Sequence, residues 1–492
     1  MKKKERRMLL VAIGVCLFLA AVDQTIISTA LPSILGQIGT INDVSLIINS
    51  YLVASVTFGP IYGKLSDVFG RKNILIFAII FFLIGTILAS LTDSSIGLAG
   101  ARFIQGIGGG GLFVLAFTIA SDLAPPRNRG KIQGLFASVF GLASISGPFF
   151  GGLIIEYLDW RWIFYFKLPF SIFSLLIVLI FFKQEKTKKI EKFNFISIFS
   201  LATLLSSIVL LFSSISLTSI FTIKNTGFLT LIIFTSLSLF LSERRSSNPL
   251  FNIEIKENNN VKLYLISAFF TGIILLSVSA FIQIYLQIVL SYKPILAGCF
   301  LIALTLGIIC ASSITGKLIS SSGKYKIYPV AGSLMLFVGC LLVVIFVIMD
   351  NSHFTLLILA LFILGLGLGP QLSVVTAAVQ NSSPRNKIGL ITGTLTTTRQ
   401  LGGIIGLSFL NLLFFINISP ISQNQNKYGL DHHEALTTSV DALAFNNSSV
   451  STSLIFETLK IGTIWVFLIM SLITIIIFAL NSLIKEVPLR DN

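Results

Sequence analysis

Long apolar segments alternate with short polar ones along most of this 492-residue chain. Fourteen of the apolar segments come close to the roughly 20 residues that a helix needs to cross the hydrocarbon core of a bilayer. They cover approximately residues 8–30, 44–62, 74–91, 96–120, 132–154, 162–182, 194–213, 226–242, 263–290, 295–315, 327–349, 354–379, 388–416 and 458–482. The pattern predicts an all-α membrane protein with fourteen spans.

Two connections are longer than the others. The first is a polar linker at residues 243–262, and the second covers residues 417–457 and is rich in Asn, Ser and Thr. We expect the second to be an exposed loop on the outer side of the membrane.

The composition agrees with a location in lipid, because 54% of the residues are hydrophobic and only 11% are charged. The formal net charge of +15 comes from 35 Lys and Arg against 20 Asp and Glu. With the N-terminus inside the cell, most basic residues fall in cytoplasmic connections, as the positive-inside rule requires. Both termini are therefore predicted to be cytoplasmic. Topology and anionic inner-leaflet lipid account for the charge without a nucleic-acid partner.

One motif occurs twice in the chain. The sequence GKLSDVFGRK at residues 63–72 returns in a less complete form as GKLISSSGKYK at residues 316–326. Both copies lie in short basic connections between predicted spans, so each half of the chain carries the same unit of two helices and a loop. An internal duplication of this kind is typical of membrane transporters.

The spacing within the first copy is specific. Its two glycines allow a tight turn and a close approach of helices, and its acidic residue can accept hydrogen bonds. A turn that merely follows the positive-inside rule accounts for the basic residues but not for the glycines, the acid or the second copy. Ser320 replaces the acid in the second copy. If the acid stabilises a closed inner gate, it can therefore do so only from the first half of the chain. The residues concerned are Gly63, Asp67, Gly70, Arg71 and Lys72.

Charged residues within the apolar segments are few, and at a helix centre each costs roughly 2.5–3.5 kcal/mol, so they tend to mark function. Asp23 is the one acidic residue well within a span. Arg102 and Arg399 are embedded cations, and Lys167 lies near the outer end of its span. Asp23 and Arg102 form the natural proton-coupling pair, because an arginine favours the ionised carboxylate and its withdrawal lets a proton bind. The alternative is a static ion pair that orders two helices.

The segment GLASISGPFFGG in the fifth predicted span combines small residues with a proline. Its glycines form a face for close packing, and the proline removes a backbone hydrogen bond, so the helix is expected to kink or rock against a neighbour. Generic packing is the alternative for such a face. The residues are Gly141, Gly147, Pro148, Gly151 and Gly152.

Several classes of protein are excluded by what the sequence lacks. It contains no GxxxxGK[ST] nucleotide loop, no cluster with metal-ligand spacing and no nucleophile and base dyad in the spans. His432 and His433 belong to the outer loop and not to a metal site. We therefore expect no enzymatic activity, no metal and no cofactor, with a proton gradient as the source of energy.

These motifs resemble, in the same order, those of the major facilitator superfamily, and specifically its drug:proton antiporter branch with fourteen spans. The matching segments are DQTIISTALPSI from Asp23, GKLSDVFGRK from Gly63, RFIQGIGGG from Arg102 and GPFFGG from Gly147. The resemblance implies the major facilitator fold. Its two six-helix bundles would occupy residues 1–192 and 263–492, and an inserted pair of helices with cytoplasmic linkers would occupy residues 193–262.

The resemblance also implies a function. A protein of this branch would be a multidrug efflux transporter of the plasma membrane, active in antibiotic resistance, that exchanges protons for lipophilic small molecules by alternating access. We expect it to work as a monomer. The resemblance assigns Asp23 and Arg102 to proton coupling, the 63–72 loop with Arg129 to an inner gate, and the glycines and proline of the fifth span to a hinge.

Polar or amphipathic residues on the spans are candidates for the central cavity, although each could instead bridge helices. They are Gln24, Tyr51, Gln105, Lys167, Gln283, Gln287, Gln371, Arg399 and Gln400. Lys167 stands where the family commonly has Asn, and it could attract anionic substrates or extend to the membrane surface. Because the second half of the chain has no deeply embedded carboxylate, we favour neutral, zwitterionic or monocationic substrates.

Other functions are open on the same scaffold. One is dedicated export of a metabolite, lipid or siderophore, another is nutrient uptake, and a third is a membrane sensor that transports nothing. The fifth-span motif favours export, and a sensor would be expected to have degraded motifs or an added soluble domain.

Overall fold

A computed structural model describes residues 3–38, 44–125, 128–182, 194–214, 223–245, 258–290, 292, 294–349, 354–384, 387–416 and 452–486. The regular structure in these ranges is helical. Most of the predicted outer loop at 417–457 lies outside the described residues. Its last residues, however, belong to a helix that starts at Thr452 instead of 458.

The first half of the chain contains seven helical elements, of which the short α6 precedes α7 directly. They are α1 (Lys3–Ile38), α2 (Val44–Phe69), α3 (Arg71–Leu91), α4 (Ser95–Leu123), α5 (Arg129–Tyr157), α6 (Trp162–Tyr165) and α7 (Lys167–Phe181). Ser94 caps α4, because its hydroxyl oxygen accepts a hydrogen bond of 3.1 Å from the amide of Gly97.

A pair of helices, α8 (Phe195–Ser214) and α9 (Ile223–Arg245), separates the two halves in sequence. The second half consists of α11 (Asn259–Ile284) with a π-helical turn η3 (Tyr285–Val289), α12 (Pro294–Ser322), α13 (Ile327–Ile348), α14 (Phe354–Asn381), α15 (Ile388–Ile416) and α18 (Thr452–Leu483). Helical elements thus occur at all the positions where the apolar pattern predicts spans.

Within the described residues, twelve helices are long and apolar enough to cross a membrane, against the fourteen that the sequence predicts. The apolar part of α8 is shorter and covers Ile196–Phe212, and α15 is not among the twelve despite its 29 residues. Helix α15 carries threonines between Thr392 and Thr398 and the adjacent Arg399 within an otherwise largely apolar sequence.

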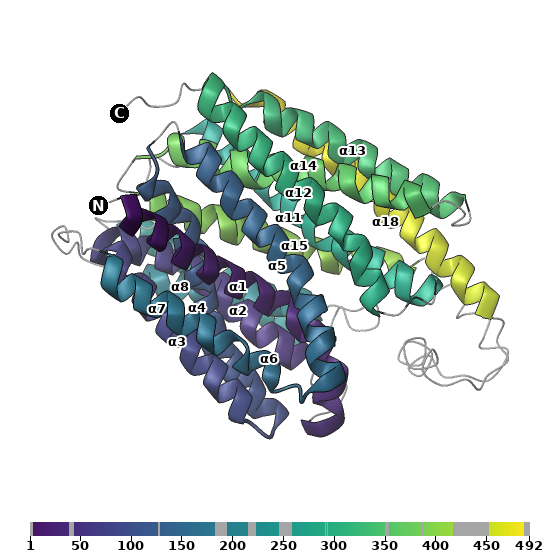
Figure 1. The fold of residues 1–492 in the computed structure, drawn as a ribbon, viewed down its shortest axis with the longest axis horizontal. Helices are drawn as coiled ribbons and strands as arrows, with labels where there is room; N and C mark the ends of the chain where they lie inside the picture. The colour runs from purple at the N-terminus through teal and green to yellow at the C-terminus, as the bar shows by residue number, and fades with distance from the viewer. Residues whose placement is uncertain are drawn as a thin grey trace.

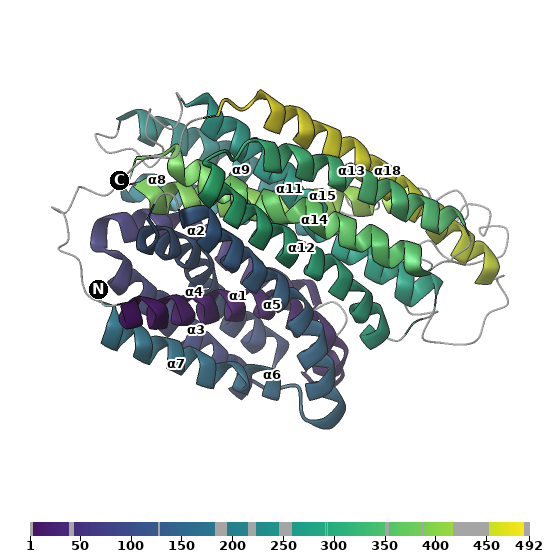
Figure 2. The same cartoon turned by 45° about the horizontal axis from the view of Figure 1, so that its top comes forward.

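The helices form two bundles that lie against each other. Helices α1–α7 make up one bundle and α11–α18 the other, drawn in purple to blue and in green to yellow in Figure 1. Helix α1 begins and α18 ends at the same end of the molecule (Figures 1 and 2). Each bundle has its own buried clusters of apolar side chains, so each half has the core that it needs to fold.

The most extensive contacts between the bundles are those of α2 with α15 and of α5 with α12, and α5 also contacts α14 and α4 contacts α15. Helix α8 packs against α2 and α15, and thereby covers the first of these seams. Thr57 of α2 and Ser206 of α8 share a hydrogen bond of 3.0 Å. Val53, Val209 and Ile404, one from each of the three helices, are buried in a common apolar cluster.

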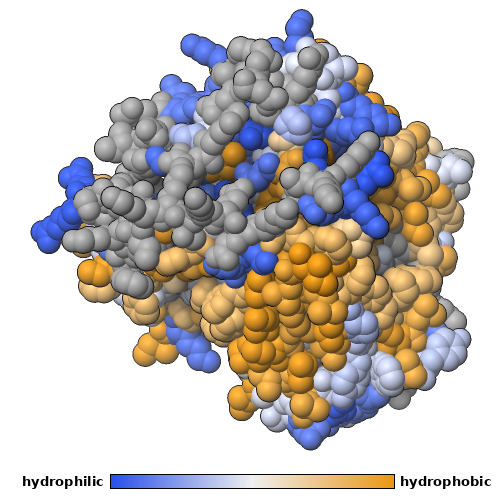
Figure 3. All heavy atoms as spheres, turned by 60° about the vertical axis from the view of Figure 1, so that its left-hand side comes forward, coloured by the Kyte–Doolittle hydropathy of each residue, from blue (hydrophilic) through white to orange (hydrophobic). Residues whose placement is uncertain are grey.

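The outer surface of the bundles carries many large apolar side chains, including Phe77, Phe149 and Ile314. Figure 3 shows this apolar flank, with hydrophilic residues gathered in the upper part of the view. A surface of this kind is suited to lipid tails and would be unfavourable in water.

The internal repeat is visible in the backbone. Gly70 follows α2 with a φ of 89°, and Gly323 follows α12 with a φ of 72°. The two positions are separated by the same 253 residues as the two copies of the motif, 323 − 70 = 316 − 63. Both turns use the left-handed region that glycine enters without steric cost.

Candidate functional site

The predicted pair of intramembrane charges is formed. Asp23 of α1 and Arg102 of α4 are both buried, and Nη1 of Arg102 donates to Oδ2 of Asp23. Nη1 of Arg102 also donates to Oε1 of Gln105 at 2.7 Å. Gln105 in turn donates to Oδ1 of Asp23 at 3.1 Å and to the hydroxyl of Thr86 at 2.8 Å. Helices α1, α3 and α4 therefore meet in one buried polar network.

Lys167 is a member of this network, which the sequence does not predict. Its amine donates to Oδ1 of Asp23 and lies 4.5 Å from the centre of the Phe164 ring. The side chain is fully buried and so does not extend to the membrane surface, and it is not among the residues that line the cavity between the bundles. Asp23 thus holds two cations, and with its carboxyl ionised the cluster has a net charge of +1.

Tyr51 and Gln105, both predicted to line the cavity, belong instead to the surroundings of this cluster. The Tyr51 ring lies 4.3 Å below the guanidinium carbon of Arg102, a cation–π contact, and its hydroxyl donates to the carbonyl of Ala20 at 3.3 Å. Gly109 of α4 is needed here, because a Cβ at that position would collide with the tyrosine hydroxyl.

The 63–72 segment, predicted to be a loop, forms the end of α2 and the start of α3 with a turn at Gly70 between them, and it contacts the opposite bundle. The carboxylate of Asp67 accepts hydrogen bonds from the amides of Gly389 at 3.1 Å and Leu390 at 2.8 Å. These amides belong to the first turn of α15, where unpaired N–H groups and the helix dipole favour an anion. Arg71 pairs with Asp67 at 2.6 Å and with Asp122 at 2.8 Å, so one guanidinium orders both acids.

The other loop residues differ in position. Gly63 faces Gly389 so closely that a Cβ would meet its carbonyl oxygen. Lys72 does not reach the opposite bundle, because its amine donates to the carbonyl of Leu179 in α7 at 3.0 Å. Arg129 is buried in the first turn of α5. In the second copy, the hydroxyl of Ser320 donates within its own helix to the carbonyl of Gly316 at 3.0 Å.

A second contact between the bundles lies deeper and was not singled out from the sequence. Gln133 of α5 donates to Oε1 of Gln380 of α14 at 3.0 Å, and both amides are buried. Gln380 also donates to the hydroxyl of Thr392 at 3.0 Å, and Gln133 donates to the carbonyl of Phe117 at 2.9 Å. Two buried glutamines 247 residues apart give no local signal in the sequence.

The small residues of α5 allow it to pack closely against two different helices. A Cβ at Gly141 would approach Thr305 of α12 to 3.1 Å, whereas a Cβ at Gly147 would collide with the hydroxyl of Thr25 in α1. Gly147 therefore allows α5 to pack against α1 two residues from Asp23. Gly151 is buried and Gly152 partly buried in the same helix. The side chain of Pro148 lies outside what the structure describes.

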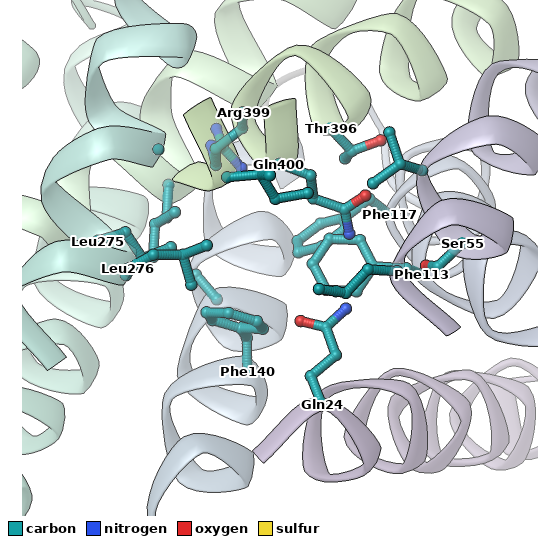
Figure 4. Close-up of a pocket in the computed structure, with 16 residues that line it drawn as sticks. Gln24, Ser55, Phe113, Phe117, Phe140, Leu275, Leu276, Thr396, Arg399 and Gln400 are labelled. Carbon is teal, nitrogen blue, oxygen red and sulfur yellow. The ribbon is translucent and has the colours of Figure 1, made fainter. Parts of the chain in front are cut away.

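A cavity lies between the bundles, with walls from α1, α2, α4 and α5 on one side and α11, α14 and α15 on the other. Gln24, Arg399 and Gln400 line it, as the sequence predicts (Figure 4). Rings of Phe113, Phe117 and Phe140 form much of its apolar wall. The space open to the centres of water-sized molecules is about 50 Å³, too little for a drug-sized solute unless the bundles move.

The remaining candidates lie elsewhere. Gln371 supports Arg399 from behind, since its backbone carbonyl accepts a hydrogen bond from Nη2 of Arg399 at 3.3 Å. Its side chain is bonded to the carbonyl of Pro329 at 2.7 Å and to Asn481 at 3.2 Å. Gln283 and Gln287, on α11 and η3, are partly buried and do not line this cavity.

Residues 13–407 match the family model described as Major Facilitator Superfamily. The chain belongs to this superfamily. It is 30% identical over 396 residues to "Multidrug resistance protein 3" of Bacillus subtilis (strain 168), which covers 80% of this chain and 76% of the relative. It is 29% identical over 457 residues to the "Efflux pump dotC" of Dothistroma septosporum (strain NZE10 / CBS 128990), covering 91% and 76% of the two chains.

Solved structures show the same fold. The human organic anion transporter MFSD10 (TETRAN) superposes with a TM-score of 0.68 at 15% identity, over 98% of this chain and 100% of that one. The proton:xylose symporter XylE superposes with a TM-score of 0.61 at 14% identity, over 99% and 97%. The protein is thus a multi-pass membrane transporter of the major facilitator fold, related to efflux pumps, and not an enzyme.

Proposed function

We propose that this transporter is a proton-coupled antiporter that exports lipophilic compounds across the plasma membrane by alternating access. The buried cluster around Asp23 carries the proposal. Its carboxylate binds two cations inside a helical bundle, so protonation of this carboxylate would change how the helices pack. The names of the relatives, a multidrug resistance protein and an efflux pump, support the direction of transport and the class of substrate.

The proposed coupling step starts with a proton that reaches Asp23 from the outer side. Protonation removes the negative charge that holds Arg102 and Lys167, so the two cations repel each other and the contact between α1, α4 and α7 loosens. Gly147 joins α5 to α1 close to this point, and α5 forms one of the two seams between the bundles. A change at Asp23 is thereby passed to the surface along which the bundles move.

In the same proposal, the contacts of Asp67 with α15 and of Gln133 with Gln380 form the gate on the cytoplasmic side. These contacts are formed in this structure, which we take to be the state closed to the cytoplasm. Release of the substrate to the outside would follow from this state, and protonation of Asp23 would then favour the opposite one. We further propose fourteen spans, with α8 and α15 crossing the membrane and both termini in the cytoplasm.

The test is dye uptake into inverted membrane vesicles energised by a proton gradient. The wild-type protein should accumulate rhodamine 6G or fluorescein in a protonophore-sensitive manner, and Asp23→Asn should remove this uptake while the protein stays inserted. Asp93→Asn is the matched control, because this acid is 86% exposed and pairs only with Arg161 among the described residues. Gradient-driven uptake by Asp23→Asn at the wild-type rate would contradict the proposal.

A further inference from the structure

The cavity between the bundles is positively charged. Among the described residues that line it, Arg399 is the one with an ionisable side chain, and no carboxylate faces the space. Figure 4 shows Arg399 on α15 beside Gln400, opposite Gln24 of α1. Polar groups at the wall are otherwise amides and hydroxyls, which bind ions of either sign weakly.

Arg399 is held there with few partners. The residue is only 6% exposed, and it takes part in no ion pair among the residues that the structure describes. Of its five N–H donors, one forms a hydrogen bond, to the carbonyl of Gln371 at 3.3 Å, and Nε is buried without a partner. A buried cation in this condition carries a desolvation cost that its one hydrogen bond offsets only in part.

The protein's own intramembrane acid cannot supply the missing charge. Asp23 already accepts hydrogen bonds from Arg102, Lys167 and Gln105 and is fully buried behind the cavity wall. Its cluster adds a further net positive charge to this side of the cavity. Both bundles therefore present a positive field to whatever occupies the space between them.

We propose that Arg399 binds the anionic group of the substrate, and that the protein's substrates are amphipathic organic anions with a carboxylate or sulfonate beside an aromatic body. The planar fork of a guanidinium matches the two oxygens of such a group. The rings of Phe113, Phe117 and Phe140 provide an apolar wall for the rest of the molecule. This replaces the neutral, zwitterionic or monocationic substrates favoured by the sequence, and it rests on the function proposed above.

Equilibrium binding tests the inference without any need for transport. The purified protein in lipid nanodiscs is titrated against fluorescein, an anion, and rhodamine 6G, a cation with the same xanthene ring system, with fluorescence polarisation as the readout. The wild type should bind fluorescein more tightly. Arg399→Gln should weaken fluorescein binding by roughly tenfold to a hundredfold, the usual effect of losing hydrogen bonds to a charged group, and should leave rhodamine 6G unchanged or improved.

Two further variants separate binding from structure. Arg399→Lys keeps the charge without the fork and should retain part of the preference for the anion. Lys317→Gln removes one exposed positive charge outside the cavity and should change neither affinity. A wild type that prefers rhodamine 6G, or an Arg399→Gln variant that loses both dyes equally, would overturn the proposal.

The result is independent of proton coupling. If rhodamine 6G is transported in a proton-dependent manner that requires Asp23 while fluorescein does not bind, the antiporter proposal stands and the anion proposal fails. If fluorescein binds through Arg399 but no dye moves in response to a proton gradient, the anion site stands and the coupling proposal fails.

Discussion

At the scale of single residues, the central fact is the charge balance around Asp23. One carboxylate faces a guanidinium and an amine, all three buried. A pair of opposite charges would be neutral and could act as a static link between helices. A triad with one acid and two bases depends on that acid, because its loss leaves two like charges at close range in a medium that screens them poorly.

The first consequence concerns stability. Asp23→Asn should lower the thermal unfolding midpoint by several degrees, since leaving buried charges without their partner costs about 3–5 kcal/mol. Lys167→Met alone should have a much smaller effect, because Arg102 still compensates Asp23. The double variant Asp23→Asn with Lys167→Met should be more stable than Asp23→Asn alone, and this non-additivity is the signature of the triad.

The measurement is thermal unfolding of the purified variants in one detergent, with Asp93→Asn as the control for loss of a surface carboxylate. Equal midpoints for Asp23→Asn and the double variant would show that the two cations do not interact through Asp23. The cycle needs no substrate, so it remains informative whatever the transporter carries.

Part of this site can be predicted from the sequence, and the reason is energetic. A charge within an apolar segment is rare enough to attract attention by itself, so Asp23 and Arg102 stand out. The role of Lys167 cannot be predicted in this way, because it lies near the end of a span and 144 residues from Asp23. Whether such a lysine turns inward or toward the membrane surface depends on the rotation of α7 in the bundle.

At the scale of helices, glycine pairs set how closely the two bundles approach. Gly63 of α2 faces Gly389 of α15, and Gly316 of α12 faces Gly130 of α5. The two pairs are related by the internal repeat and lie on the two seams. Backbone meets backbone at both places, so the contact has no flexible side chain that could yield to a larger residue.

We therefore predict that Gly63→Ala and Gly316→Ala each prevent the seams from closing. A Cβ at Gly316 would lie 2.6 Å from the carbonyl oxygen of Gly130, and at Gly63 the collision with Gly389 is closer still. Transport should fall by roughly tenfold or more, because destabilising the closed state by only about 1.4 kcal/mol shifts the equilibrium between the open and closed states tenfold.

The control is Gly100→Ala, a helical glycine of α4 with nothing within 4 Å of its added Cβ. Electron paramagnetic resonance between labels at Lys131 and Lys317 reports the separation of α5 and α12 near the proposed gate. A normal label distance in Gly316→Ala, together with wild-type transport, would contradict the prediction.

The helices themselves are the part of the fold that the sequence predicts best, because apolar length and lipid leave the backbone few alternatives. The glycine turns at Gly70 and Gly323 also follow from the repeat. What the apolar pattern cannot give is which helix faces which. The threonines of α15 look like an interruption in an apolar segment, and they become intelligible only when α15 is seen to line the interface between bundles.

At the scale of the whole molecule, the two bundles have similar folds but carry different buried charged residues. The first carries the triad around Asp23, and the second carries Arg399 without an acid. Position 399 corresponds to Phe140 by the offset that relates Gly389 to Gly130, 399 − 140 = 389 − 130, and both side chains line the same cavity. In the functions proposed above, this difference between the two halves separates the site of the proton from the site of the substrate.

This division leads to a prediction about energy that depends on the charge of the substrate. Exchange of one inward proton for one outward neutral molecule moves one charge across the membrane, and for a monovalent anion it moves two. At roughly 2.3 kcal/mol per charge per 100 mV, the membrane potential alone would support about a fiftyfold gradient of a neutral substrate and about a two-thousandfold gradient of an anion. For a monovalent cation the exchange moves no net charge, so the potential would contribute nothing.

The experiment uses proteoliposomes without a pH difference, in which valinomycin and potassium gradients set potentials of defined size and sign. Fluorescein derivatives with a single negative charge should be transported at a rate and to an extent that rise steeply with the potential, and rhodamine 6G should show no such dependence. Asp23→Asn should reduce this dependence to at most that of the single charge on the anion itself, because the proton and its charge no longer move with the substrate. An anion whose transport ignores the potential in the wild type would mean that proton and substrate are not exchanged in this ratio, even if Arg399 binds the substrate.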